Sequence, residues 1–285
     1  MRGVDALYDR YQRRAEIYER YWGPVLAPSA RAVLEHVDDR LDPDGDGRVA
    51  LDVGCGTGVL TVELLRRWPR SRVVALDLTP AMLAVTRDRV ARELGAAAAD
   101  RVTAIEGTVE ALPATWPRGL PRADVAVSSF VLQIVPDRSA ALRAIRAVVR
   151  PGGRFAYVTW QDDQETFAPL DAFDAAVGEA EIDEPDGPPD GRSGPLRSAR
   201  AAAAQLRRAG FRAVGAADGM LEHRWDAEGY LAFKLDYEEE ELVRTLDAAA
   251  RDRLATAARR RLGALHPDEF IWRTPIVFAW GDRPG

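Results

Sequence analysis

Hydrophobic positions follow two alternating spacings between about residues 49 and 160. Short apolar runs typical of buried strands alternate with segments in which apolar side chains recur every three or four residues, as on one face of a helix. The expected strands cover 49–53, 71–77, 101–107, 123–129 and 154–160. Strands that alternate with helices in this way favour an α/β fold with a doubly wound sheet and right-handed crossovers.

The N-terminal segment predicts an amphipathic helix with an aromatic face. Aromatic and aliphatic side chains recur at helical spacing over 4–22, with charged residues on the other side. Pro24 and Pro28 are expected to break the chain before a second helix at 29–37, because proline lacks the N–H that a helix interior requires. The aromatic face fits either packing on the core or a lid over a ligand.

The C-terminal third predicts a helix, a bent strand, a helical insertion and a last strand. These elements are expected at 198–209, 211–225, 226–262 and 270–280. Pro275 favours a place at or near the edge of the sheet for the last strand, since proline cannot donate a ladder hydrogen bond. Before these elements, the proline- and glycine-rich composition of 186–195 indicates a mobile loop.

These elements divide the chain into a core and three pieces outside it. The core is expected to comprise 36–160, 198–225 and 266–285. The pieces outside it are expected to be an N-terminal helical lid at 1–35, a lid loop at 161–197 and a helical cap at 226–265. In open α/β sheets, ligands bind outside the carboxyl ends of the strands. We therefore expect the three pieces to cover that edge and to form a substrate chamber.

The first predicted strand ends in three alternate glycines, Gly54, Gly56 and Gly58, ahead of a helical pattern. Glycine can adopt positive φ and allows a ligand to approach the backbone. The N-terminus of the following helix presents free N–H groups and the positive end of the helix dipole, which favour a carboxylate. A dinucleotide fingerprint would need glycine or alanine at position 59, where Val59 stands.

An acidic residue ends the second predicted strand. Asp77 follows the glycine loop by about 20 residues, the position from which a carboxylate accepts hydrogen bonds from ribose hydroxyls. Thr79 and Pro80 then predict the start of a helix, as its N-cap and its first residue. The glycine loop and this carboxylate together predict a nucleoside site.

The sequence DVGCGTG at 52–58 resembles motif I of the class I S-adenosylmethionine (SAM) dependent methyltransferases. Three further elements follow in the order and spacing of that family. They are the strand that ends at Asp77, the segment 107–113 and the Arg-Pro-Gly-Gly turn at 150–153. Tyr11 and Tyr18 resemble a pattern in the methyltransferases of ubiquinone and menaquinone biosynthesis that closes over SAM. This ordered set is more specific than any one of its motifs.

The resemblance implies a Rossmann-like, mostly parallel sheet with an antiparallel last strand, with SAM as cofactor and S-adenosylhomocysteine (SAH) as product. It implies that the glycine loop holds the methionine part, that Asp77 holds the ribose and that adenine lies at Thr108, where the family has an aspartate. Gln133 stands where many relatives have a histidine. The residues expected to bind the cofactor are Tyr11, Tyr18, Asp52, Gly54, Cys55, Gly56, Gly58, Asp77, Leu78, Met82, Thr108, Val109, Ser128 and Gln133.

Composition narrows the possible partners. The 285 residues carry a net charge of −6 and no dense basic block, which argues against a nucleic-acid substrate. No apolar run approaches the ~20 residues of a membrane span, and the N-terminus does not resemble a signal peptide, so a cytoplasmic location without a membrane partner is expected. The single cysteine, Cys55, forms no internal disulfide or cysteine-based metal cluster, and no metal is expected. Monomer and homodimer both remain open.

The expected reaction is in-line transfer of a methyl group from SAM to an oxygen, nitrogen or carbon nucleophile of a small molecule, in secondary metabolism or quinone-type biosynthesis. Positioning and exclusion of water supply most of what this reaction needs. Residues that could assist the acceptor are His223, Tyr18 and Gln133. For His223 the simpler interpretation is a histidine with a structural hydrogen bond at a strand end.

Two other functions remain open from the sequence. A SAM-binding protein that does not methylate, whether regulatory or a catalyst of a rearrangement, would carry the same motifs, because a fold does not determine a function. An NAD-dependent oxidoreductase would share the strand, the glycine loop and the acidic residue. The glycine spacing and the turn at 150–153 favour the methyltransferase over the oxidoreductase.

Overall fold

The computed structural model describes residues 2–163, 166–182 and 192–285. The chain divides into two compact units. The first comprises Met1–Asp162, Gly191–Gly219 and Pro275–Gly285, and the second comprises Asp163–Asp190 and Met220–Thr274. The second unit therefore draws on both the lid loop and the helical cap that the sequence placed outside the core, whereas most of the loop expected at 186–195 lies outside the described residues.

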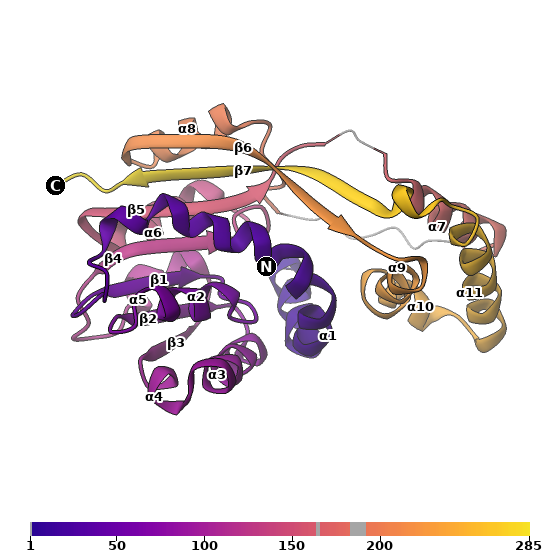
Figure 1. Cartoon of the computed structure of the whole chain (residues 1–285), viewed down its shortest axis with the longest axis horizontal. Coiled ribbons are helices and arrows are strands. Elements are labelled where there is room, and N and C mark those ends of the chain that lie inside the picture. The colour runs from indigo at the N-terminus through magenta and orange to yellow at the C-terminus, as the bar shows by residue number, and fades with distance from the viewer. Residues whose placement is uncertain (1, 164–165, 183–191) are drawn as a thin grey trace. The chain divides into compact units, whose positions relative to one another are not determined.

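Within the described residues the chain forms a seven-stranded sheet in the order β3-β2-β1-β4-β5-β7-β6 (Figure 1). Its strands are β1 (Val49–Val53), β2 (Arg72–Asp77), β3 (Val102–Glu106), β4 (Ala123–Ser129), β5 (Val149–Trp160), β6 (Arg212–Arg224) and β7 (Ile271–Asp282). Strands β1 to β5 pair in parallel, and β7 runs antiparallel to β5. The predicted doubly wound sheet with an antiparallel last strand is confirmed.

The central strands are buried on both faces, as continuous apolar runs predict for a parallel sheet. Every residue of β1 is buried, and only the first residue of β2 is exposed. The helices of the first unit are α1 (Arg2–Ala32), α2 (Val59–Arg67), α3 (Pro80–Leu94), α4 (Ala96–Ala99), α5 (Leu112–Thr115), α6 (Arg138–Val148) and α8 (Ala199–Arg208). Among the described residues, none of the helices has the length and apolar character needed to cross a bilayer.

Side-chain caps mark the starts of helices α3 and α6. Thr79 accepts a hydrogen bond from the Met82 amide, with Pro80 at the first helical position of α3. Asp137 caps α6 in the same way. Such caps satisfy amide groups that the first helical turn leaves without a partner. The cap at Thr79 places the start of α3 directly beyond the carboxyl end of β2.

Helix α1 differs from the prediction. It continues through Pro24 and Pro28, so the expected break and the separate second helix do not occur. The helix is instead kinked at Arg14, where φ is −132° and ψ is 19°. Val25 and Ala30 are buried on the face that packs into the first unit. Burial of this face offsets the hydrogen bonds that the prolines cannot make, because most helical stability in proteins comes from packing.

Strand β7 lies beside the edge strand rather than at the edge itself. It separates β5 from β6, and its pairing with β5 reaches Ile276, opposite Trp160. Pro275 stands just before this pair, and its carbonyl accepts a hydrogen bond from the Gln161 amide. Pro275 thus stands opposite Gln161 just past the paired residues, and its missing N–H removes the second of the two hydrogen bonds that such a pair would exchange.

The second unit contains a cluster of aromatic side chains within a helical framework. Its helices are α7 (Ala168–Glu179), α9 (Ala227–Phe233), the π-helix Lys234–Glu238, α10 (Glu240–Thr245) and α11 (Ala248–Leu262). Lys234, the single lysine of the chain, is buried, pairs with Glu239 at 2.7 Å and lies over the ring of Phe173. This ion pair and ring contact compensate for the loss of water around the ammonium group.

We expect Gly215→Ala to destabilise the protein by about 1–3 kcal/mol, because a Cβ there would lie 2.3 Å from the Trp280 ring of the neighbouring strand. Gly178→Ala in α7 is the matched control: its Cβ meets nothing within 4 Å, and alanine favours a helix. Urea unfolding of both variants measures the difference. Equal stability of the Gly215 variant and the unmodified protein would contradict the close packing of β6 on β7.

Candidate functional site

The glycine loop after β1 is shaped by backbone angles and close packing that exclude other residues. Gly54, Gly56 and Gly58 have φ values of 67°, 53° and 85°, in the left-handed region. A Cβ on Gly54 would lie 2.3 Å from Val131, whereas a Cβ on Gly56 would meet nothing within 4 Å. The loop is therefore packed against the residues after β4 at Gly54 and faces open space at Gly56.

Two neighbouring cavities, of about 300 Å³ and about 50 Å³, open beside this loop. Both are lined by Tyr18, Gly54, Gly56 and Ser129. The larger cavity lies at the carboxyl ends of β1, β2 and β4, where ligands bind in open α/β sheets. Its walls also include Tyr11, Leu76, Asp77, Leu78, Met82, Gly107, Thr108, Val109, Glu110, Phe130, Val131, Ile134, Val135, Pro136 and Asp137.

Asp77 joins the glycine loop to the start of α3 and lines the larger cavity. Its Oδ2 accepts a hydrogen bond from the Gly56 amide at 2.8 Å, and its Oδ1 accepts one from the Thr79 amide at 3.1 Å. Burial raises the pKa of this carboxyl above its usual value, and the amide hydrogen bonds oppose that rise. The Thr79 hydroxyl also donates to Oδ1, at 3.5 Å, so Oδ2 is the oxygen that can accept a second hydrogen bond.

Asp52 is the second buried carboxylate of the site, and it lines the smaller cavity. Its Oδ2 accepts a hydrogen bond from the Thr61 hydroxyl at 2.7 Å, whereas its Oδ1 is buried without a hydrogen-bond partner among the described residues. Burial raises the pKa of this carboxyl to about 7. A buried oxygen without a partner is costly, so the small cavity fits a ligand group that donates hydrogen bonds or carries positive charge.

The aromatic face of α1 lies at the cavities and is attached to α3. Tyr11 and Tyr18 line the larger cavity, and their rings meet edge to face with centroids 5.7 Å apart. The Gln12 side chain accepts a hydrogen bond from the Ala81 amide at 3.1 Å, and Glu19 pairs with Arg89 at 3.0 Å. The two tyrosines thus form part of the wall of the larger cavity.

Ser128 and Gln133 differ from the prediction that placed them at the ligand. The Ser128 hydroxyl donates to the Val53 carbonyl at 2.9 Å, and the Gln133 amide donates to the Phe130 carbonyl at 2.6 Å. Both side chains are buried, and neither lines either cavity. Ser129 and Phe130 are in the walls instead. The alternation of side chains along a strand places Ser128 and Ser129 on opposite faces, and that signal was present in the sequence.

Cys55 and Gly58, both in the glycine loop, contact Thr86 of α3. The Cys55 thiol lines the smaller cavity and is close to the Thr86 hydroxyl, which donates to the Gly56 carbonyl at 2.7 Å. Burial raises the pKa of this thiol well above its ordinary value, so it stays protonated at neutral pH. Gly58 is the N-cap of α2 and packs against Thr86 rather than lining a cavity.

His223 lies in the second unit and is not among the residues that line either cavity. Its ring meets that of Trp225 at 4.6 Å with an interplanar angle of 75°. Burial lowers the pKa of this histidine. These surroundings favour the structural interpretation of His223 that the sequence offered. The described residues also contain no group of three or more potential ligands that could hold a metal ion.

Comparisons with known proteins agree with this geometry. Residues 51–155 match the family model described as a methyltransferase domain. The chain is 29% identical over 169 residues to a malonyl-[acyl-carrier protein] O-methyltransferase of Halalkalibacterium halodurans, over 59% of each chain. It is 33% identical over 135 residues to a ubiquinone biosynthesis O-methyltransferase of Xanthomonas axonopodis pv. citri, over 47% of this chain and 52% of the relative. The chain thus spans little more than half the length of these relatives.

The fold is also similar to a solved structure of a phosphoethanolamine N-methyltransferase 2 of Haemonchus contortus. That structure is a complex with phosphomonomethylethanolamine and S-adenosylhomocysteine. The TM-score is 0.51 with 17% sequence identity, over 90% of this chain and 53% of that one. At this identity the similarity concerns the fold alone.

We expect Asp52→Asn to stabilise the ligand-free protein by about 2–4 kcal/mol at pH 8 and to leave it nearly unchanged at pH 4. The folded pKa of about 7 lies above the ordinary 3.8, so the stability from the protonated carboxyl is present at low pH and is lost as pH rises through about 7. Denaturant unfolding at both pH values measures this. Asp88→Asn, which changes an exposed carboxyl on α3, is the control. If Asp52→Asn changed the stability equally at both pH values, the raised pKa of Asp52 would be contradicted.

Proposed function

The resemblance of residues 51–155 to the class I SAM-dependent methyltransferases is confirmed, and on this premise we propose that the protein transfers a methyl group from SAM to a small molecule. The product of the cofactor is then SAH. Both curated relatives described above are O-methyltransferases by name, which favours an oxygen atom as the nucleophile. The substrate and the pathway of this chain are left open by the relatives, whose names differ.

One observation carries the proposal: two neighbouring cavities that share wall residues are each lined by a buried carboxylate. Asp52 lines the smaller cavity with an oxygen that has no partner among the described residues, and Asp77 lines the larger one. SAM has a cationic ammonium group at the end of its methionine arm and two hydroxyls on its ribose. A carboxylate suits each of these groups, because ammonium and hydroxyl groups both donate hydrogen bonds to it.

The small cavity would hold the methionine arm. Its unpaired Asp52 oxygen would accept from the ammonium group, and the nearby start of α2 would favour the carboxylate. Gly56 leaves room for the arm to pass, since a Cβ there would project into open space. When bound, SAM supplies a methyl group on a positively charged sulfur, which is the electrophile of the reaction.

The large cavity would hold the adenosine. Asp77 would accept a hydrogen bond from the ribose hydroxyls, chiefly at Oδ2, whose single partner is the Gly56 amide. Leu78, Met82 and Val109 offer apolar walls for the adenine ring. Thr108 replaces the aspartate of the family, so its hydroxyl or the backbone at Val109 would meet the amino group of adenine.

The acceptor would react with little help from a base. The Gln133 amide is bonded to the Phe130 carbonyl and the His223 ring packs on Trp225, whereas Tyr18 lines the wall that both cavities share and is the candidate we favour. A carboxylic acid is ionised at neutral pH and needs no base, whereas a phenol is helped by one. The chain's main contribution is then to orient the two substrates and to exclude water.

The experiment that tests the function is incubation with methyl-labelled SAM and a panel of small carboxylic acids and phenols. Transfer of the label to an acceptor, with release of SAH, is the expected result. Binding of SAM without transfer or SAH release under any condition would favour the alternative of a non-methylating SAM protein. Binding of NADH in place of SAM in parallel titrations would favour an oxidoreductase.

We expect Asp77→Ala to weaken SAM binding by about 1–3 kcal/mol, because hydrogen bonds to a charged group are lost. Isothermal titration calorimetry with SAM measures this. Asp88→Ala, at an exposed position on α3, is the matched control and should leave the affinity unchanged. Unchanged affinity of the Asp77 variant would refute its role toward the ribose.

A further inference from the structure

The place where the two cavities meet identifies where the reacting sulfur would lie. Tyr18, Gly54, Gly56 and Ser129 line both cavities. In SAM the methionine arm and the adenosine are joined at the sulfur atom. If each arm occupies one cavity, as proposed above, the sulfur lies at the junction that these residues form. The next residue after Ser129 is Phe130, which lines the larger cavity.

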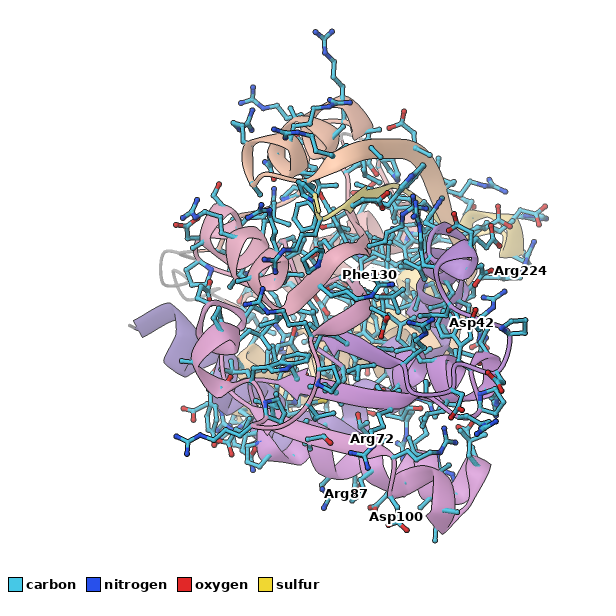
Figure 2. The ribbon with its side chains drawn as sticks, turned by 90° about the vertical axis from the view of Figure 1, so that its left-hand side faces the viewer. Asp42, Arg72, Arg87, Asp100, Phe130 and Arg224 are labelled. Carbon is cyan, nitrogen blue, oxygen red and sulfur yellow. The ribbon has the colours of Figure 1, made fainter. Side chains whose placement is uncertain are left out.

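Phe130 has a backbone conformation that phenylalanine rarely adopts. Its φ is 53°, in the left-handed region, although it carries a bulky side chain. The residue is 6% exposed, and its ring lies 4.2 Å from the ring of Trp160, at an interplanar angle of 41°. In Figure 2 Phe130 is labelled near the middle of the molecule, whereas Arg72, Arg87 and Asp100 are labelled toward its lower side. Such strain persists only where the surrounding structure enforces it, and it is concentrated at functional sites.

Hydrogen bonds on both sides of the Phe130 backbone enforce this conformation. Its amide donates to the Val158 carbonyl at 2.9 Å, and its carbonyl accepts from the Gln133 side chain at 2.6 Å. Gln133 is itself fixed, because its Oε1 accepts from the Thr159 hydroxyl at 2.8 Å. The chain Thr159, Gln133, Phe130 therefore connects β5 to the turn that presents the phenylalanine ring.

On the basis of the proposed function, we propose that Phe130 is a specificity residue for the sulfonium of SAM and that Gln133 is its positioning residue. The face of an aromatic ring attracts a cation. The sulfur of SAM is positively charged and that of SAH is neutral, so the Phe130 ring, on the wall of the larger cavity and next in sequence to Ser129 at the junction, favours SAM over SAH. This preference helps the product to leave. Tyr18, on the shared wall, offers a second ring from α1.

The simpler interpretation is that Phe130 only packs against Trp160 and shapes the cavity. The two interpretations differ in a measurable way, because SAM and SAH share every group except the methyl group and its charge. Loss of packing weakens both ligands by the same factor. Loss of a ring at the sulfonium weakens SAM and spares SAH.

The experiment is isothermal titration of SAM and of SAH into the full chain and its variants. For Phe130→Leu and Phe130→Met, we expect the affinity for SAM relative to SAH to fall by about three- to tenfold. Phe130→Tyr keeps a ring and should keep the ratio. Phe167→Leu, which removes an aromatic ring in the second unit, is the control and should leave both affinities unchanged.

Gln133 is tested in the same titrations. Gln133→Leu removes the donor to the Phe130 carbonyl and should also lower the affinity for SAM relative to SAH. Gln133→His restores a donor and should recover this affinity ratio. In the double variant with Phe130→Leu, the Gln133→Leu change should have no further effect on the ratio, because it acts through the ring. Independent effects of the two changes would overturn the positioning role.

Equal weakening of SAM and SAH by Phe130→Leu and Phe130→Met would overturn the role of Phe130 and leave the proposed function intact. Failure of the unmodified chain to bind either compound would overturn the proposed function and the inference with it. Circular dichroism of each variant establishes that it is folded. If the leucine variant is unfolded, the methionine and Gln133 variants decide the question.

Discussion

The hydrogen bond between the Gly56 amide and the Asp77 carboxylate joins the ends of two neighbouring strands, and the geometry of the site depends on it. Strands β1 and β2 are paired in parallel, so their carboxyl ends lie side by side. The bond ties the loop after the first to the last residue of the second. It also places a buried carboxylate on the cavity wall. The positive φ of Gly56 directs its N–H toward Asp77 while the space beside its Cα stays open for a ligand.

Several unfavourable features of the molecule lie around the two cavities. Burial raises the pKa of both Asp52 and Asp77, and Phe130 adopts a positive φ. Each of these features costs folding free energy, which apolar burial elsewhere in the first unit offsets. The fully buried strand β1 and the apolar faces of α2 and α6 supply that burial. Features that cost stability and gather at one cavity are expected of a binding site rather than of a packing defect.

The order of the predicted elements was sufficient to derive most of the fold. Strand and helix periods, the cap at Thr79 and the glycine loop are local patterns within a few residues, and the structure confirms the elements they predict. The carboxylate of Asp77 could also be located, because the position of an acid at the end of the second strand follows from chain order. By contrast, the two pieces of the second unit are separated in sequence, and no local pattern assigns them to one compact unit.

The sequence by itself therefore determined the central strands, the glycine loop and the carboxylate that ends the second strand, because each depends on neighbours along the chain. Tertiary structure alone decided whether Pro24 and Pro28 break α1, since packing of that helix outweighs its lost hydrogen bonds. It also decided that Gln133 supports Phe130 rather than facing the cavity. That role requires Thr159, which lies on another strand and is brought into contact only when β4 and β5 pair.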